Sequence, residues 1–274
     1  MSETTALEIL RIALPGRGER RADEVAVEEP LEIRVEGHSL AVVMRTPGAD
    51  RELAAGFLLS EGIISSAADV FDITTCVPAG GSGNAVDVGL TKPRDFDPEK
   101  FSRHVFTSSS CGICGKTSIE AVLRHRQPLT DALIVTPEII ASLPAQLSRV
   151  QSSFERTGGL HACALFDRHG SLLGIREDVG RHNALDKLAG SALLEKRTPL
   201  AANILLLSGR ASFEMLQKAY TAGIRVIAAI GAPSSLAVDF ARESGQTLIG
   251  FLRGQTMNVY TGEQRVALPA LASA

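Results

Sequence analysis

The chain has 274 residues, of which 45% are hydrophobic and 22% charged, and its formal net charge is -3. This balance is typical of a globular protein with a sizeable core, and it gives no general attraction to nucleic acid or to an anionic membrane. No apolar run is long enough to span a membrane, the first ten residues do not resemble a signal peptide, and four cysteines are too few for a disulfide scaffold. We therefore expect a cytoplasmic protein.

The N-terminal half is expected to be rich in β-structure. Residues 1–22 are polar and rich in glycine and arginine, and we expect a loose tail there. A β-rich subdomain is expected over residues 23–127, because apolar residues alternate with polar ones and glycine-containing turns separate the runs. Its expected elements are a hairpin of 31–35 with 40–45, a helix over 50–61, a hairpin of 70–77 with 85–90, a strand at 104–107 and a helix over 117–125.

Pro128 marks the start of a different pattern, in which helices alternate with short apolar runs. Strands that are separated by helices form a parallel sheet with right-handed crossovers, so we expect residues 128–274 to form an α/β domain with a mixed sheet between helices. The expected elements are a helix over 137–156, a hairpin of 161–167 with 172–177, a helix over 181–195, strands at 203–207, 225–230 and 247–251, and helices over 211–222 and 234–244.

The most informative motif is the pair of thiols at Cys111 and Cys114, which serines precede and Gly115 and Lys116 follow. The glycines and serines predict an accessible loop, and the expected helix beyond it places Cys114 near a helix N-terminus. A helix N-terminus and a neighbouring lysine favour the thiolate, which is the reactive form of cysteine. The motif therefore predicts sulfur chemistry or metal binding.

Several kinds of site contain such a pair of cysteines. A zinc site requires two further ligands, and the remaining thiols, Cys76 and Cys163, are isolated, although His161 lies near Cys163. The zinc deaminase signature is broken, because Cys163 stands where the general acid/base glutamate belongs. A phosphate-binding P-loop lacks its first glycine, since Ser110 occupies that position. Redox or sulfur-transfer chemistry, without zinc, is the interpretation best supported.

A second group of polar residues follows the expected strands of the α/β domain. Arg210, Ser234, Ser235 and Arg253 come after three successive parallel strands, and Arg181 follows the hairpin. Ligands of open α/β sheets bind outside the carboxyl ends of the strands. Serines at a helix start and arginines at this edge predict a site for phosphate or pyrophosphate.

The chain resembles the formate dehydrogenase accessory sulfurtransferases, the FdhD family, in motifs that run in order along most of its length. The Asp178–Lys187 run is the most specific of them. Cys163 departs from the pattern, because a small apolar residue is expected there. The matching stretches are 109–116, 157–162, 177–187, 208–210, 232–237, 250–253 and 258–261.

The resemblance implies a fold similar to that of cytidine deaminases but without zinc, and it implies a homodimer. A cysteine desulfurase would pass a persulfide sulfur to the cysteine loop, and the sulfur would then pass to the molybdenum (or tungsten) bis(molybdopterin guanine dinucleotide) cofactor of formate dehydrogenase. Cys111 would hold the persulfide, and Cys114 would assist or resolve. GDP would bind as a fragment of the cofactor, and the cofactor-binding span would consist of Phe251, Leu252, Arg253, Gly254, Gln255 and Thr256.

Two other functions stay open at this point. The protein would act as a non-catalytic chaperone for the cofactor and for formate dehydrogenase if the cysteines were only regulatory. It would act as a thiol-disulfide oxidoreductase if the cysteine pair exchanged electrons rather than sulfur.

Overall fold

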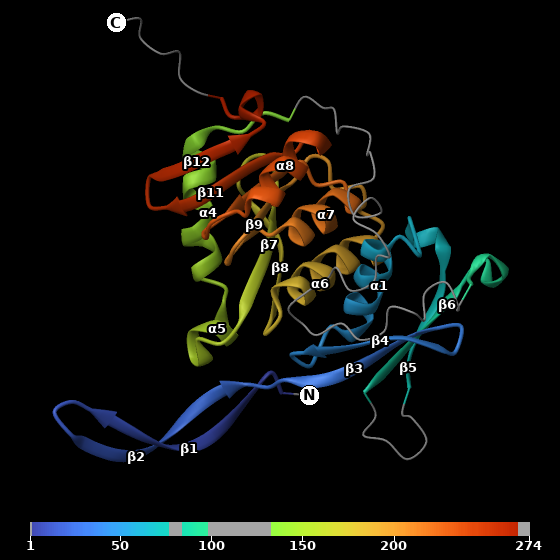
Figure 1. The fold of residues 1–274 in the computed structure, drawn as a ribbon. Coiled ribbons are helices and arrows are strands. Elements are labelled where there is room, and N and C mark those ends of the chain that lie inside the picture. The colour runs from blue at the N-terminus through green and yellow to red at the C-terminus, as the bar shows by residue number, and fades with distance from the viewer. Residues whose placement is uncertain (1, 77–83, 98–132, 268–274) are drawn as a thin grey trace, which may run out of the picture.

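The computed structural model describes residues 2–76, 84–97 and 133–267 (Figure 1). Cys111 and Cys114 lie outside these ranges, as do the strand expected at 104–107 and the helix expected over 117–125. Across the described ranges, none of the helices has the length and apolar character needed to cross a membrane.

The C-terminal half contains a six-stranded mixed sheet in the order β12-β11-β10-β9-β7-β8. Strands β9, β10 and β11 are parallel, whereas β7 and β12 run antiparallel to their neighbours. The mixed α/β sheet predicted for this half is therefore confirmed. The strands are β7 (His161–Phe166), β8 (Leu172–Asp178), β9 (Ile204–Leu207), β10 (Val226–Ala229), β11 (Thr247–Arg253) and β12 (Thr256–Thr261).

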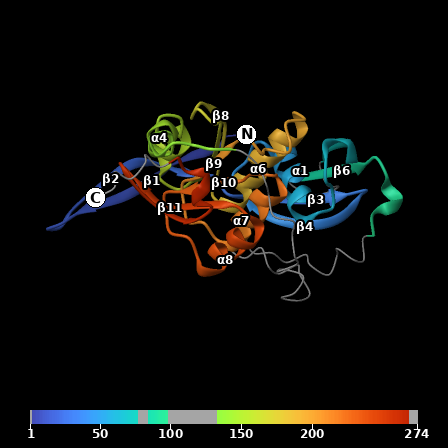
Figure 2. The same ribbon diagram turned by 90° about the horizontal axis from the view of Figure 1, so that it is seen from above.

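Helices cover both faces of this sheet (Figures 1 and 2). Successive residues of a strand point to opposite faces, so Leu206 packs with α4 while Leu205 packs with the helices on the other side. Helix α4 (Pro137–Ser148) covers one face, and α6 (Arg181–Leu194), α7 (Phe213–Thr221) and α8 (Ser235–Ser244) cover the other.

The prediction of a single helix over 137–156 is wrong, because the chain forms α4 and then a separate helix, α5 (Ser152–Thr157). No glycine or proline marks the break. Tertiary contacts fix α5 in its own direction, since the hydroxyl of Ser153 donates to the carboxylate of Glu3 and the backbone N–H of Phe154 donates to Glu177 Oε1 over 3.0 Å.

The N-terminal half forms a four-stranded sheet in the order β4-β3-β6-β5, with helix α1 (Asp50–Glu61) packed against it. Both predicted hairpins are confirmed, and a parallel pairing of β3 with β6 joins them. The strands are β3 (Glu29–Val35), β4 (His38–Arg45), β5 (Val70–Cys76) and β6 (Ala85–Leu90).

The prediction of a loose tail over residues 1–22 is wrong. Strands β1 (Thr4–Ala13) and β2 (Arg17–Ala26) pair along their whole lengths and form a hairpin that extends away from the body of the protein (Figure 1). The sequence suggested a tail because this segment is polar and rich in glycine and arginine. The backbone ladder nevertheless closes around a tight turn, in which Gly16 has a φ of 102°.

Helices α1 and α6 pack so closely that the two halves share one hydrophobic core. A Cβ atom at Gly56 would overlap the carbonyl oxygen of Asp186, and a Cβ atom at Gly190 would overlap the carbonyl oxygen of Glu52. Each helix therefore needs a glycine at the crossing point, because any side chain there would force the helices apart.

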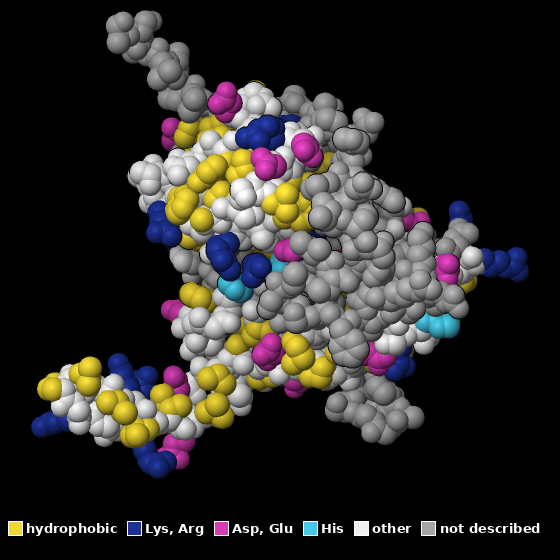
Figure 3. Space-filling model, viewed as in Figure 1, with side chains coloured by type: hydrophobic (Ala, Val, Ile, Leu, Met, Phe, Trp, Pro, Cys, Tyr) yellow, Lys and Arg dark blue, Asp and Glu magenta, His cyan; other side chains and the backbone are white. Residues whose placement is uncertain are grey.

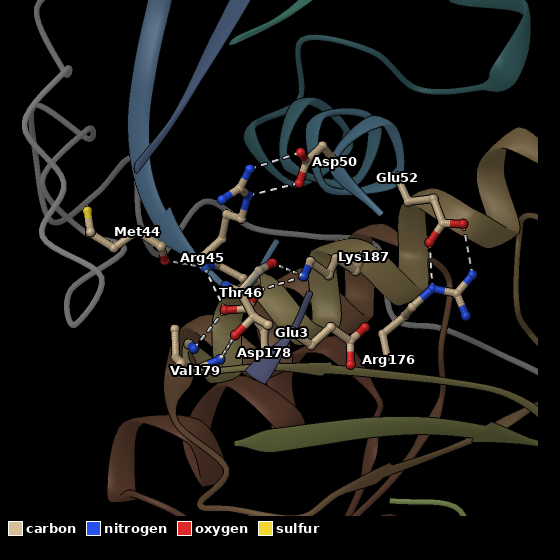
Figure 4. A network of polar contacts seen from close by, with 12 residues as sticks. Glu3, Met44, Arg45, Thr46, Asp50, Glu52, Arg176, Asp178, Val179 and Lys187 are labelled. Carbon is tan, nitrogen blue, oxygen red and sulfur yellow. Dashed lines mark hydrogen bonds and ion pairs between the residues drawn. The ribbon is translucent and has the colours of Figure 1, made fainter. Parts of the chain in front are cut away.

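A buried carboxylate connects the halves beside this crossing (Figure 4). Asp178, at the end of β8, is 0% exposed, and Lys187 Nζ lies 2.8 Å from its Oδ2 atom. The backbone N–H of Thr46 also donates to Oδ2, over 3.1 Å, while the N–H of Gly180 and the amide of Asn183 donate to Oδ1 over 2.8 and 3.0 Å. Burial raises the pKa of Asp178, and the Lys187 ammonium opposes this effect.

We expect Asp178→Asn to lower the free energy of unfolding by about 3–5 kcal/mol, because the change leaves Lys187 buried without a counter-charge. Asp239→Asn is the matched control, since Asp239 pairs with Arg242 on the exposed surface of α8, and its cost should stay below about 1 kcal/mol. Urea unfolding of both variants measures the two values. Equal costs would contradict a structural role for the buried pair.

Candidate functional site

The structure brings the predicted binding residues to one edge of the six-stranded sheet, with the exception of the Leu252 side chain. Because β9, β10 and β11 are parallel, the turns after them meet at the same edge. Arg210, Ser234 and Arg253 lie there with exposed side chains. Leu252 does not contribute its side chain, because that side chain is buried in the core under the sheet.

Backbone hydrogen bonds join these turns into one rigid rim. The N–H of Gly231 donates to the carbonyl of Gly209 over 3.0 Å, and the N–H of Phe251 donates to the carbonyl of Gly231 over the same distance. A Cβ atom at Gly231 would come within 2.7 Å of the Gly209 carbonyl oxygen, so only glycine permits this approach. The turns after β9, β10 and β11 therefore hold one another in place.

Phe251 combines an unusual backbone with an exposed side chain. Its φ is 50°, a left-handed conformation that bulky residues rarely adopt, and its side chain is 40% exposed. The surrounding ladder maintains this strain at an irregularity in the pairing of β11 with β12. Backbone strain of this kind collects at ligand-binding sites. The span expected to bind the cofactor forms the end of a hairpin, in which Gly254 and Gln255 connect Arg253 to Thr256.

The serines open helix α8, as the sequence predicted. Ser234 is its N-cap and its hydroxyl accepts a hydrogen bond from the N–H of Ala237 over 3.3 Å, while Ser235 is the first helical residue. Both side chains are exposed. The remaining free N–H groups of this turn face the same edge as Arg210 and can donate to an anion.

A group of basic side chains lies at the same edge, where β7 begins and β8 ends. We refer to His161, Arg181, His182 and Arg210 as the basic cluster. Burial lowers the pKa of His161, and the charges of Arg181, His182 and Arg210 lower it further, while Asp178 acts in the opposite direction. Figure 3 shows such a combination of dark blue and cyan side chains gathered near the middle of the face that it draws.

The sequence indicated Arg181 and Arg210 but did not predict that His161 and His182 lie beside them. His161 was considered only as a zinc ligand beside Cys163. In the fold, β7 starts at the rim, and the backbone at Gly209 packs against the His161 ring. The ring Nε2 of His182 lies 3.3 Å from Glu214 Oε2, and this contact lowers the pKa of Glu214 against the effect of burial.

The cysteines that the structure describes do not form a reactive centre. Cys163 is 1% exposed, and burial raises the pKa of its thiol, which disfavours the thiolate. Cys76 is partly buried at the end of β5. Within residues 2–76, 84–97 and 133–267, no group of three or more His, Cys, Asp or Glu side chains is placed to hold a metal ion. The absence of zinc stays a prediction, as do the roles of Cys111 and Cys114.

Comparisons with known proteins agree on one family. The model of the FdhD/NarQ family matches residues 26–267. The sulfur carrier protein FdhD of Streptomyces avermitilis is 52% identical over 98% of both chains, and the protein of the same name from Mycobacterium tuberculosis is 50% identical over 90% of this chain and 92% of its own.

A solved structure supports the same assignment. The crystal structure of a candidate formate dehydrogenase accessory protein from Desulfotalea psychrophila superposes with a TM-score of 0.76 at 25% identity, and the match covers 97% of this chain and 100% of that one. The sequence motifs, the mixed sheet and these full-length matches lead to one conclusion: the chain belongs to the FdhD/NarQ family.

Proposed function

We propose that the protein is a cytoplasmic sulfur carrier and sulfurtransferase that passes a persulfide sulfur from a cysteine desulfurase to the molybdenum bis(molybdopterin guanine dinucleotide) cofactor, which formate dehydrogenase then receives. The observation that carries the proposal is the Cys111–Cys114 pair in a chain that is 52% identical to a protein named as a sulfur carrier. The names of the relatives support the sulfur-carrying role, and the residues at the rim support the choice of cargo.

The chemistry divides into two balanced steps at the cysteine pair. The Cys111 thiolate attacks the outer sulfur of the donor's persulfide, so that a new S–S bond forms on Cys111 and the donor leaves as a thiolate. The Cys114 thiolate then attacks the inner sulfur, which forms a Cys111–Cys114 disulfide and releases hydrosulfide for the acceptor. The sulfane sulfur gains two electrons and the two cysteines lose them, so a cellular thiol must reduce the disulfide before the next cycle.

The rim fits a ligand that carries nucleotides and phosphates. The N-terminus of α8 offers free N–H groups, Arg253 offers a planar guanidinium for bidentate pairing, and Phe251 offers an exposed aromatic ring. An aromatic ring suits the guanine base, and the N–H groups and the guanidinium suit the pyrophosphate. They support the proposal that Phe251–Thr256, Arg210, Ser234 and Ser235 bind the cofactor, and GDP as a fragment of it.

We also propose that the protein forms a homodimer through the β1–β2 hairpin. Two-stranded hairpins are marginally stable alone in water, and this one exposes four large apolar side chains, Leu7, Leu10, Ile12 and Leu14. Its base is acidic and its tip is mainly basic, so two antiparallel hairpins would match in charge. The base carries Glu8, Asp23 and Glu24, and the tip half carries Arg11, Arg17, Glu19, Arg20 and Arg21.

We expect Cys111 to gain one sulfur atom when the protein is incubated with a cysteine desulfurase and cysteine, because its loop favours an accessible thiolate. Mass spectrometry of the intact protein and of its peptides measures the adduct, which should disappear on reduction. Cys111→Ala should abolish it, and Cys76→Ser is the matched control that should retain it. If the sulfur were found only on Cys76 or Cys163, the assignment would be wrong. A Cys111→Ala protein that still matures active formate dehydrogenase would instead favour a non-catalytic chaperone.

We expect Arg253→Ala to weaken GDP binding by ~10-fold to ~100-fold, because a charge-assisted bond to phosphate contributes roughly 1.5–3 kcal/mol. Arg253→Lys should restore only part of the affinity, since an ammonium does not reproduce the guanidinium fork. Arg242→Ala, in the last turn of α8, and Cys111→Ala should bind as the wild type does. Calorimetric titration gives the dissociation constants of the wild type and of the four variants. Unchanged affinity in Arg253→Ala would place the nucleotide elsewhere.

We expect the double substitution Leu10→Ser and Ile12→Ser to convert the dimer to a folded monomer with the far-UV circular dichroism of the wild type, because both side chains lie on the exposed hairpin. Analytical ultracentrifugation measures the assembly state. Exposed Phe71, on β5, provides the control, and Phe71→Ser should leave the dimer intact. A double variant that stays dimeric would show that another surface forms the interface.

A further inference from the structure

The first turn of α6 carries an unusual charge for a helix N-terminus. Peptide dipoles make this end of a helix positive, so acidic residues normally occupy the first turn, as Asp50 and Glu52 do in α1 and Glu214 does in α7. Helix α6 has no acidic residue there and begins instead with Arg181 and His182, and no side chain caps it at Gly180. Positive side chains on a positive helix end are unfavourable unless an anion is bound.

The carboxylates close to this turn are already engaged. Asp178 accepts hydrogen bonds from four donors, among them Lys187, and Glu214 contacts His182 and accepts from the hydroxyl of Ser212. Glu214 attracts the charge of Arg181, but the two form no ion pair. Neither carboxylate is therefore free to neutralise the remaining positive charge.

Two arginines of the basic cluster keep unused hydrogen-bonding capacity. The Nε atom of Arg181 is buried from solvent and has no acceptor among the described residues. Arg210 projects from the turn after β9 and is exposed, and in residues 133–267 it makes no ion pair. A buried guanidinium N–H without an acceptor is costly, so its persistence points to a missing partner that carries negative charge.

The cluster converges from three elements onto one place. His161 comes from β7, Arg181 and His182 from α6, and Arg210 from the turn after β9. The backbone at Gly209, next to Arg210, packs against the His161 ring, and His161 lies opposite Asp178, three residues before Arg181, in the β7–β8 ladder. Burial lowers the pKa of His161, and the charges of Arg181, His182 and Arg210 lower it further, while Asp178 acts in the opposite direction. Cations that approach one another across separate elements are a common way to bind phosphate groups.

We propose that the basic cluster, together with the free N–H groups at the start of α6, is a binding site for a multiply charged oxyanion of the phosphate class. Arg181 and Arg210 donate to the anion with their side chains, and the first-turn N–H groups of α6 donate from the backbone. His161 adds a third side-chain donor, and a positive charge when it is protonated. The site depends on these residues alone and not on the identity of the cargo proposed above.

This site shares Arg210 with the proposed cofactor-binding residues but is distinct from the Phe251–Thr256 hairpin. In the strand order β11-β10-β9-β7, His161 lies three inter-strand steps from the hairpin, roughly 14 Å at about 4.8 Å per step, and Arg210 lies two steps from it, roughly 10 Å. A free oxyanion would occupy the cluster alone. A ligand with its aromatic base on Phe251 would reach Arg210 before it reached His161 and Arg181.

Inorganic pyrophosphate is the probe that tests the proposal by calorimetric titration. We expect the wild type to bind it, and Arg210→Gln and Arg181→Gln each to bind it at least about 10-fold more weakly. Arg210 is exposed, so its substitution leaves the fold intact. Arg242→Gln on the far end of α8 is the matched control and should bind as the wild type does. No binding by the wild type, or equal dissociation constants in all four proteins, would overturn the proposal.

A second readout follows from the charge of His161. A bound dianion stabilises the imidazolium, so pyrophosphate should raise the pKa of His161 above its depressed value in the free protein, and binding should weaken as the pH rises through that pKa. NMR titration of the His161 ring with and without pyrophosphate measures the change, and a pKa that does not move would contradict direct contact.

Competition with GDP shows whether the oxyanion is the phosphate part of a nucleotide or a separate, free oxyanion. Displacement of pyrophosphate by GDP means that the cluster holds the phosphates of a nucleotide. Simultaneous binding of both means that it holds a separate oxyanion. Both results support the site, and failure of GDP to bind at all would count against the proposed cargo while leaving the pyrophosphate result unaffected.

Discussion

The arrangement of the rim depends on one buried carboxylate. Asp178 ends β8, and its two oxygens accept hydrogen bonds from the segment after β4, from the turn before α6 and from two side chains of α6 itself. The free-energy cost of removing such a group from water is offset only when every lone pair has a hydrogen-bond partner. The carboxylate therefore fixes where α6 begins, and so determines that Arg181 and His182 lie at the edge of the sheet.

The glycine contact between α1 and α6 extends this constraint to the whole molecule. With Gly56 and Gly190 at the crossing, the backbones of the two helices approach more closely than side chains would permit. The four-stranded sheet and the six-stranded sheet consequently bury their apolar residues in one core. Buried polar groups at the crossing, such as Lys218 with Asp186 and Ser60, add directional contacts that apolar packing lacks.

The rim combines two kinds of recognition on one rigid edge. At β11 and β12, a strained and exposed Phe251 offers an aromatic surface, and at β7, β8 and β9 the basic cluster offers positive charge. Because backbone hydrogen bonds connect the intervening turns, neither part has to be ordered when a ligand arrives. Such preorganisation reduces the entropic cost of binding. The cysteine pair belongs to a different segment of the sequence, so binding and sulfur chemistry can be altered separately.

The sequence by itself determined the elements whose signals are local. Alternating apolar residues predicted the hairpins of β3 with β4 and β5 with β6. The positions of Arg210, Ser234 and Arg253 after successive parallel strands predicted a common edge. Only the tertiary structure decided the features that depend on distant partners. Glu3 and Glu177, from elsewhere in the chain, fix the break between α4 and α5. The β1–β2 hairpin, which has no buried face, and the proximity of His161 to Arg181 are two further examples. Sequence periodicity reports which face of an element is buried, but it carries no information about which distant residue completes a hydrogen bond or a charge cluster.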